Sequence, residues 1–137
     1  MEITDEVPEE AIQAIIAEDW KTAYLIIHKM ALLGNVNAEH FMGWFYEQGI
    51  EVAQSDKNAF EWWSKSASYG VPESQCGIAQ LYEYGRGTKQ DYINSYVWYS
   101  RAIMSGDEES QILIANLSNK MNEMQLTQAK EKLNEKT

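Results

Sequence analysis

Residues 37–70 read NAEHFMGWFYEQGIEVAQSDKNAFEWWSKSASYG, and residues 73–106 repeat the pattern as ESQCGIAQLYEYGRGTKQDYINSYVWYSRAIMSG. Aligned without gaps at a shift of 36 residues, the two stretches share eight identical positions among 34, where ordinary composition gives about two. A repeat of this length with helical patterning is typical of a solenoid, in which each unit buries its apolar face against its neighbours. The sequence therefore predicts an all-α fold, an α-solenoid of stacked antiparallel helix pairs with about eight helices.

Each unit carries signals for two helices. Residues 37–48 predict the first helix, and Gly49 supplies the left-handed position that ends it. Ser55 or Asp56 begins the second helix of this unit, and Asp91 is the corresponding cap in the next unit. Apolar and aromatic residues recur at spacings of three and four within these segments, which indicates helices with one buried face.

The segment before the repeat is a degenerate copy of the unit. Its first helix opens with Pro8 at a first helical position, and Asp19 caps a second helix that ends at Gly34. The same shift of 36 residues aligns this second helix with that of the next unit. Residues 7–34 therefore predict a degenerate N-terminal repeat with a shortened loop.

The segment after the repeat indicates that the array ends there. Ser118 stands where the unit has an aromatic residue, and Asn122 followed by Gln125 predicts a capping box before a final amphipathic helix. Residues 109–135 are thus a partial repeat with a capping helix. We predict one helical-repeat domain over residues 1–137, with units at 7–34, 37–70, 73–106 and 109–135.

The charge of the chain restricts its partners. The 137 residues include 11 basic and 21 acidic side chains, a formal net charge of −10. This balance repels nucleic-acid phosphates and anionic lipids, so we expect neither a nucleic acid nor a membrane as partner. It favours a protein partner with a basic surface, although solubility alone also explains it.

Nothing in the sequence indicates export. Cys76 is the only cysteine, so it has no partner for an internal disulfide. Residues 1–10 are acidic, unlike a secretory signal, and no segment approaches the roughly 20 apolar residues that span a bilayer. We therefore expect a cytoplasmic protein.

Both units fit one pattern, A-x-x-x-L-G-x-x-Y-x-x-G-x-x-V-x-x-D-x-x-K-A-x-x-W-Y-x-K-A-A-x-x-G. The first unit supplies Ala38, Met42, Gly43, Tyr46, Gly49, Val52, Ala59, Trp62, Trp63, Lys65, Ala67 and Gly70. The second supplies Ser74, Ile78, Ala79, Tyr82, Gly85, Asp91, Trp98, Tyr99, Arg101, Ala102 and Gly106. The pattern resembles the Sel-one-like repeat family, a branch of the tetratricopeptide-type helical repeats. This resemblance implies a scaffold for protein interactions, with no catalytic residues or cofactor shared by the family.

Catalytic and metal-binding patterns are weak. His28 and His40 are the only histidines, and although His40 shares its station in the repeat with Cys76, two ligands do not make a zinc site. No G-x-S-x-G elbow is present, and the turn at residues 85–87 lacks the Gly-Lys-Ser/Thr of a phosphate-binding loop. We therefore predict no catalytic residue, no metal and no cofactor.

The outward positions of the first helices are the candidate binding surface. If the units stack as in related solenoids, these helices line a concave groove. Its predicted partner-binding residues are Asn37, His40, Trp44, Glu47, Gln48, Glu73, Cys76, Gln80, Glu83, Tyr84, Glu109, Ile112 and Asn116. The repeat pattern does not require Trp44, because the second unit has Gln80 there. We interpret Trp44 either as a binding hot spot among carboxylates or as a cover for a neighbouring apolar edge.

Three functions remain open from the sequence. The first is a non-catalytic protein-interaction module, an adaptor or regulatory scaffold that takes a basic protein in its groove, with Trp44 and Tyr84 as anchors. The second is an immunity protein that neutralises a cognate secreted toxin by covering its basic active surface. The third is a glycan-binding or cell-wall-binding module, which would require an exported chain.

Overall fold

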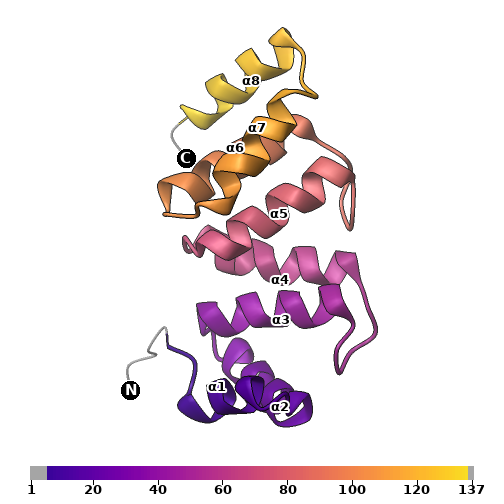
Figure 1. Cartoon of the computed structure of the whole chain (residues 1–137), viewed down its shortest axis with the longest axis vertical. Helices are drawn as coiled ribbons and strands as arrows, with labels where there is room; N and C mark the ends of the chain where they lie inside the picture. Colours follow the sequence, from indigo (N-terminus) through magenta and orange to yellow (C-terminus); the bar gives the residue numbers. More distant parts are fainter. Residues whose placement is uncertain (1–5, 136–137) are drawn as a thin grey trace.

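The computed structural model describes residues 6–135, which form eight α-helices and contain no strand (Figure 1). The helices are α1 (Glu9–Ile16), α2 (Trp20–Leu32), α3 (Val36–Gln48), α4 (Asp56–Ser68), α5 (Pro72–Tyr84), α6 (Tyr92–Met104), α7 (Glu109–Ser118) and α8 (Glu123–Leu133). They stack in chain order along the long axis, from α1 and α2 at one end to α8 at the other (Figure 1). The predicted all-α solenoid is confirmed. Within the described residues, no helix has the length and apolar content to cross a lipid bilayer.

Most helices of the stack pack against the next helix in the chain. The pairs α1 with α2, α3 with α4 and α5 with α6 are in contact, and α2 with α3 and α4 with α5 join neighbouring pairs. At the C-terminal end, α7 and α8 both pack against α6. Each helix pair therefore buries its apolar face against the pair beside it, as a solenoid requires.

The two central units close their loops with the same contacts. The glycine that ends the first helix has a φ of 69° after α3 and 65° after α5, a left-handed conformation that glycine adopts without strain. The Tyr46 carbonyl then accepts a hydrogen bond from the Ser55 amide at 3.0 Å. In the next unit the Tyr82 carbonyl accepts one from the Asp91 amide at 2.9 Å. Residues 36 positions apart in the sequence therefore occupy equivalent places in the structure.

Helix starts are fixed by local caps. The side chains of Ser55 and Asp91 accept a backbone hydrogen bond from the first turns of α4 and α6, and Asn122 and Gln125 form a reciprocal capping box at α8. These predicted caps are confirmed. The start of α1 differs from the prediction, because Pro8 is the N-cap residue with an extended backbone and lies outside the helix.

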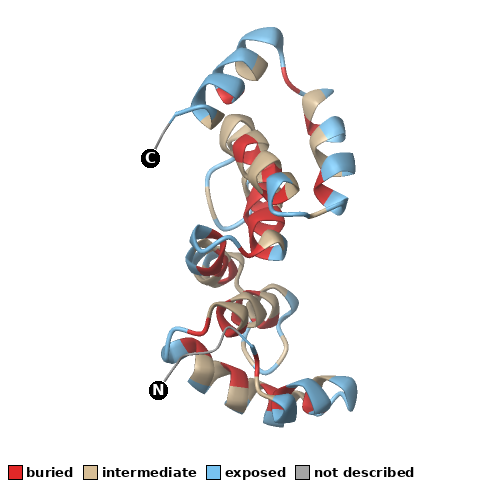
Figure 2. Cartoon of the chain, turned by 90° about the vertical axis from the view of Figure 1, so that its left-hand side faces the viewer, coloured by how far each residue is buried: buried red, intermediate tan, exposed pale blue. Residues whose placement is uncertain are grey.

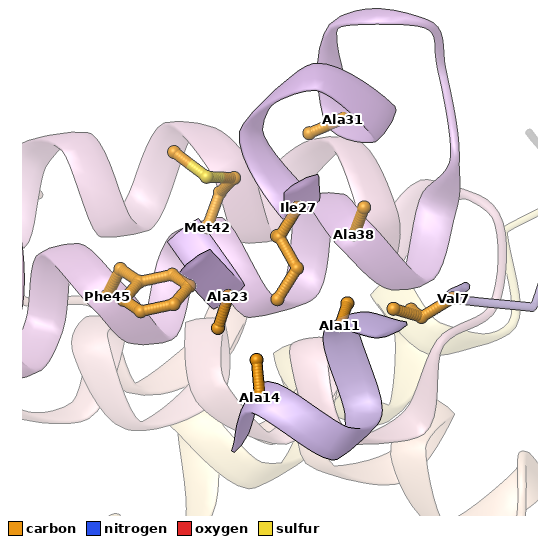
Figure 3. Close-up of a cluster of buried hydrophobic side chains, with 9 residues drawn as sticks. All are labelled: Val7, Ala11, Ala14, Ala23, Ile27, Ala31, Ala38, Met42 and Phe45. Carbon is orange, nitrogen blue, oxygen red and sulfur yellow. The ribbon is translucent and has the colours of Figure 1, made fainter. Parts of the chain in front are cut away.

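Buried side chains run through the middle of the stack (Figure 2). The cluster at the N-terminal end joins α1, α2 and α3 and is rich in alanine (Figure 3). Its members are Val7, Ala11, Ala14, Ala23, Ile27, Ala31, Ala38, Met42 and Phe45. Small side chains allow these helices to approach closely, so larger aromatic side chains fill the outer edges of the cluster.

Trp63 fixes the spacing between α3 and α5. A Cβ atom added to Gly43 would collide with the indole of Trp63, and one added to Gly77 would lie 2.7 Å from its Cε3 atom. The indole N–H also donates a hydrogen bond to the His40 carbonyl at 2.9 Å. Gly43 and Gly77 therefore both lie where a helix backbone approaches this indole closely, a role of Gly77 that the sequence alone did not indicate.

Candidate functional site

The first helices of successive units lie side by side. α3 contacts α5 and α5 contacts α7, although a second helix separates each pair in the chain. Their outward positions therefore share one surface, which we call the first-helix face. Of the predicted partner-binding residues, the exposed ones are Gln48, Glu73, Tyr84, Glu109, Ile112 and Asn116. The partly buried ones are Asn37, His40, Trp44, Glu47 and Gln80, and the buried ones are Cys76 and Glu83.

Cys76 is buried, which contradicts its predicted place on the binding surface. Only 5% of it is exposed, and burial raises the pKa of its thiol to about 12, so the thiol is neither accessible nor reactive. The cause is the side of α5 on which Cys76 lies. Cys76 faces α7, where it lies in hydrogen-bond contact with Ser110, just as His40 contacts Ser74 one unit earlier. At these two positions the side chain contacts the next unit.

Glu83 is also buried, which contradicts its predicted place on the binding surface. One of its carboxylate oxygens accepts a hydrogen bond from the Tyr99 hydroxyl at 2.8 Å, and the other pairs with Lys120 Nζ at 2.7 Å. Burial and the bond to Glu83 raise the pKa of Tyr99, which keeps the hydroxyl protonated as the donor. In the first unit Trp63 replaces this tyrosine, and the equivalent Glu47 is only partly buried.

Trp44 packs against aromatic neighbours. Its ring centroid lies 5.4 Å from that of Trp20 and 5.5 Å from that of Phe45. It thus covers the apolar edge of the N-terminal cluster, which was one of its two interpretations. The remaining surface of Trp44 lines a small apolar hollow of about 170 Å³, together with Ile15, Trp20, His40, Phe41 and Phe45.

A larger cleft lies beside this hollow. It has a volume of about 840 Å³ and is lined by residues 6–9, Ile12, Met30, Asn37, His40, Phe41 and Glu73. One wall is the segment before α1, which is held in place because the Asn35 side chain donates a hydrogen bond to the Glu6 carbonyl at 3.2 Å. Val7 anchors the same segment in the core. We call the cleft and the small hollow together the N-terminal cleft.

His40 lines both the larger cleft and the small hollow. Its Nδ1 atom is 2.8 Å from the Ser74 hydroxyl oxygen, and its ring stacks on Trp63 at a centroid distance of 6.3 Å. Burial lowers the pKa of His40, although the nearby Glu73 acts in the opposite direction. The imidazole is therefore neutral near pH 7 and adds no positive charge to the cleft.

The polar chain behind His40 does not form an accessible catalytic group. The Ser74 hydroxyl also contacts the Ser66 hydroxyl at 2.5 Å, and both serines are fully buried between the helices. A nucleophile needs access to its substrate, which this position does not give. Among residues 6–135, no three His, Cys, Asp or Glu side chains lie together as potential metal ligands.

Two central segments of the chain match a known family model. The Sel1 repeat model matches residues 36–70 and 72–107, which together make up just over half of the chain. In sequence, the chain is also 32% identical over 63 residues to Chitin synthase regulatory factor 3 of Schizosaccharomyces pombe. That similarity covers 46% of this chain and 7% of the yeast protein, so the chain corresponds to a small part of that relative.

Solved structures show the same architecture. The Sel1 repeat protein from Oxalobacter formigenes superimposes with a TM-score of 0.67 at 26% identity, covering 70% of this chain and 72% of that one. The protective antigen c5321 of uropathogenic Escherichia coli, which has an SLR fold, gives 0.78 at 25% identity and covers 82% of this chain and 24% of that one. Helicobacter pylori cysteine rich protein B shares the fold, with a TM-score of 0.64 at 19% identity over 68% of this chain and 70% of that one. The repeat pitch, the stacked helices and the match over both central units show that the chain belongs to the Sel1 repeat family.

Proposed function

We propose that this protein is a non-catalytic binding module that takes a protein partner along its first-helix face. Sel1 repeat proteins are generally protein-interaction scaffolds and are typically non-catalytic. The observation that carries the proposal is that the helices of this face expose both apolar side chains and carboxylates. Tyr84 and Ile112 are 60% and 67% exposed, and Glu73 and Glu109 are exposed on the same helices. Apolar anchors and charges on one surface are common in binding sites.

The charge of the chain supports a partner with a basic surface. The formal net charge is −10, and the exposed carboxylates of the first-helix face have the sign that attracts lysine and arginine side chains. The name of the yeast relative describes a regulatory factor, which fits a regulatory form of the same binding role. We therefore favour an adaptor or regulatory scaffold over other binding functions.

Site-specific photo-crosslinking tests the proposal. A benzoylphenylalanine at position 84 places the crosslinker on the first-helix face, and one at position 69 places it at the end of α4, where Tyr69 is 74% exposed. In native lysate we expect one protein to crosslink from position 84 and not from position 69. The purified partner should bind the double variant Tyr84→Ala, Ile112→Ser about tenfold more weakly than wild type, and Tyr69→Ala normally. Equal crosslinking from both positions, or unchanged affinity of the double variant, would refute the proposal.

Neutralisation of a secreted toxin is a second form of the same function, favoured by the excess of 21 acidic over 11 basic side chains. The test is co-expression with a toxin encoded beside this gene. If wild type restores growth and the variant Tyr84→Ala, Ile112→Ser does not, the toxin-neutralising function is established. If the variant restores growth as well, the protein uses another surface.

A further inference from the structure

The N-terminal cleft places an acidic compartment beside an apolar one. His40 and Phe41 line both the cleft of about 840 Å³ and the hollow of about 170 Å³, so the two are neighbours. The larger volume lies within the range of protein sites that enclose a ligand, and the smaller one suits a single hydrophobic side chain. A ligand that fills both compartments must therefore combine a polar portion with an apolar side chain.

The charges of the larger compartment have one sign. Glu6, Glu9 and Glu73 line it, and among the described residues no lysine or arginine lines either compartment. Glu6 comes from the segment before α1, Glu9 from the first turn of α1 and Glu73 from the first turn of α5, so three separate parts of the chain supply the carboxylates. None of the three takes part in an ion pair within the described part of the chain. Such a cleft attracts a cation and repels phosphate or anionic lipid.

Both compartments have apolar lining. Ile12 and Phe41 line the larger compartment, and Ile15, Trp20 and Trp44 line the smaller one. Ile12 is 38% exposed, so part of this apolar surface remains open to solvent. Aromatic walls around a small hollow are the usual setting of a binding hot spot.

We propose that the N-terminal cleft binds a short segment of a protein partner that carries a lysine or arginine close to an aliphatic or aromatic residue. The apolar side chain enters the hollow beside Trp44, and the basic side chain lies between Glu9 and Glu73. This inference rests on the proposed function and adds the chemistry of the bound segment. Charge complementarity and the neighbouring apolar hollow select this occupant, because an acidic or wholly polar segment would leave one compartment unmatched.

Selection from a phage-displayed library of random heptapeptides tests the inference. The bait is the whole chain, compared with the variant Glu9→Lys, Glu73→Lys. The matched control is Glu10→Lys, Glu123→Lys, because these exposed glutamates also lie in first turns of helices and give the same change of charge. Circular dichroism checks that all three proteins are folded.

We expect the wild type and the control to enrich peptides with a basic residue within two positions of an apolar one. A labelled peptide from this pool should bind the cleft variant about tenfold more weakly than the control, with weaker binding at higher salt, because two exposed attractions become repulsions. Replacing its lysine or arginine by alanine should remove most of the difference between the two proteins. Changing its apolar residue to serine should weaken binding to both.

Three results of the selection would each overturn the inference. Either no peptide is enriched, or the enriched peptides lack basic residues, or they bind the cleft variant and the control equally. Binding of the partner that is captured by crosslinking from position 84 shows whether the cleft inference alone is wrong or the proposed function is wrong as well. If that partner binds the cleft variant normally but loses affinity for Tyr84→Ala, Ile112→Ser, the cleft inference is wrong and the first-helix face remains the binding surface.

Discussion

Glu39 carries an unfavourable buried charge that the repeat itself shows how to correct. Only 7% of the residue is exposed, and its Oε1 atom has no hydrogen-bond partner. The equivalent residue in the next unit is Gln75, whose side-chain amide donates to the Ala67 carbonyl at 3.3 Å. Ala31 stands 36 residues before Ala67 and is buried in the same way. We predict that Glu39→Gln stabilises the protein, because the new amide can donate to the Ala31 carbonyl.

The size of the effect follows from two contributions. A net hydrogen bond contributes about 1 kcal/mol, and neutralising the side chain removes a desolvation cost that the attraction of Lys65 offsets only in part. We expect an increase of about 1–2 kcal/mol in the free energy of unfolding near pH 7. For a chain of 137 residues this corresponds to a rise in Tm of about 3–6 °C.

The dependence on pH identifies the cause. Burial raises the pKa of Glu39 above its ordinary value of 4.5, so the folded protein binds a proton there more readily than the unfolded chain does. The cost of the charged carboxylate is therefore complete at neutral pH. It decreases as the pH falls through the raised pKa, and it is absent below 4.5. The advantage of Glu39→Gln over wild type should shrink in the same range.

Urea denaturation at pH 7.5 and pH 4.5, followed by circular dichroism, measures both quantities. The reciprocal variant Gln75→Glu is the matched control, since it places a carboxylate at the same station of the next unit, and it should lose stability at pH 7.5. A variant Glu39→Gln that is no more stable than wild type at pH 7.5, or whose gain is the same at both pH values, would show that the buried carboxylate is not the origin of the cost.

Three further predictions use the same denaturation assay. The free energy of unfolding of Gly77→Ala should be about 1–2 kcal/mol lower than that of wild type, despite the better helix propensity of alanine. The reason is that the new Cβ atom would lie 2.7 Å from Trp63, which is held on its other side by Gly43. A stabilised variant would contradict this packing. Tyr99→Phe should lose about 1–2 kcal/mol with the hydroxyl bond to the buried carboxylate, and an unchanged free energy would refute that role. Because the pKa of His40 is lowered in the folded protein, its contribution to stability is complete above the ordinary pKa of 6.5 and decreases as the pH falls towards the lower folded value. The variant His40→Gln should therefore lose less free energy of unfolding than wild type between pH 7.5 and 5.5. An equal loss in both proteins would contradict the prediction.

The helices and their limits could be predicted because their signals are local. Ser55 and Asp91 cap helices through backbone atoms three residues away, and the glycine after α3 ends that helix by its own backbone preference. The 36-residue shift then predicted which residues are equivalent, and the loop contacts of Tyr46 and Tyr82 agree with it. The caps, the helical periodicity and the repeat together were thus sufficient to predict the architecture.

The binding surface could be predicted only in part. The periodicity identifies the side of a helix, and Tyr84 and Ile112 are exposed where it placed them. It does not show which outward positions a neighbouring unit covers. Cys76 is covered by α7, and Glu83 is closed off by Tyr99 and Lys120, which follow it by 16 and 37 residues.

The sequence by itself determined the helices, their caps and the pitch of the repeat, because those depend on residues close together in the chain. Tertiary structure alone decided the N-terminal cleft. Its wall is held by a hydrogen bond between Asn35 and Glu6, 29 residues apart, and its acidic side chains come from the segment before α1, from α1 and from α5. Contacts at such separations depend on how the helices stack, and the stacking is set by packed side chains such as Trp63 between Gly43 and Gly77.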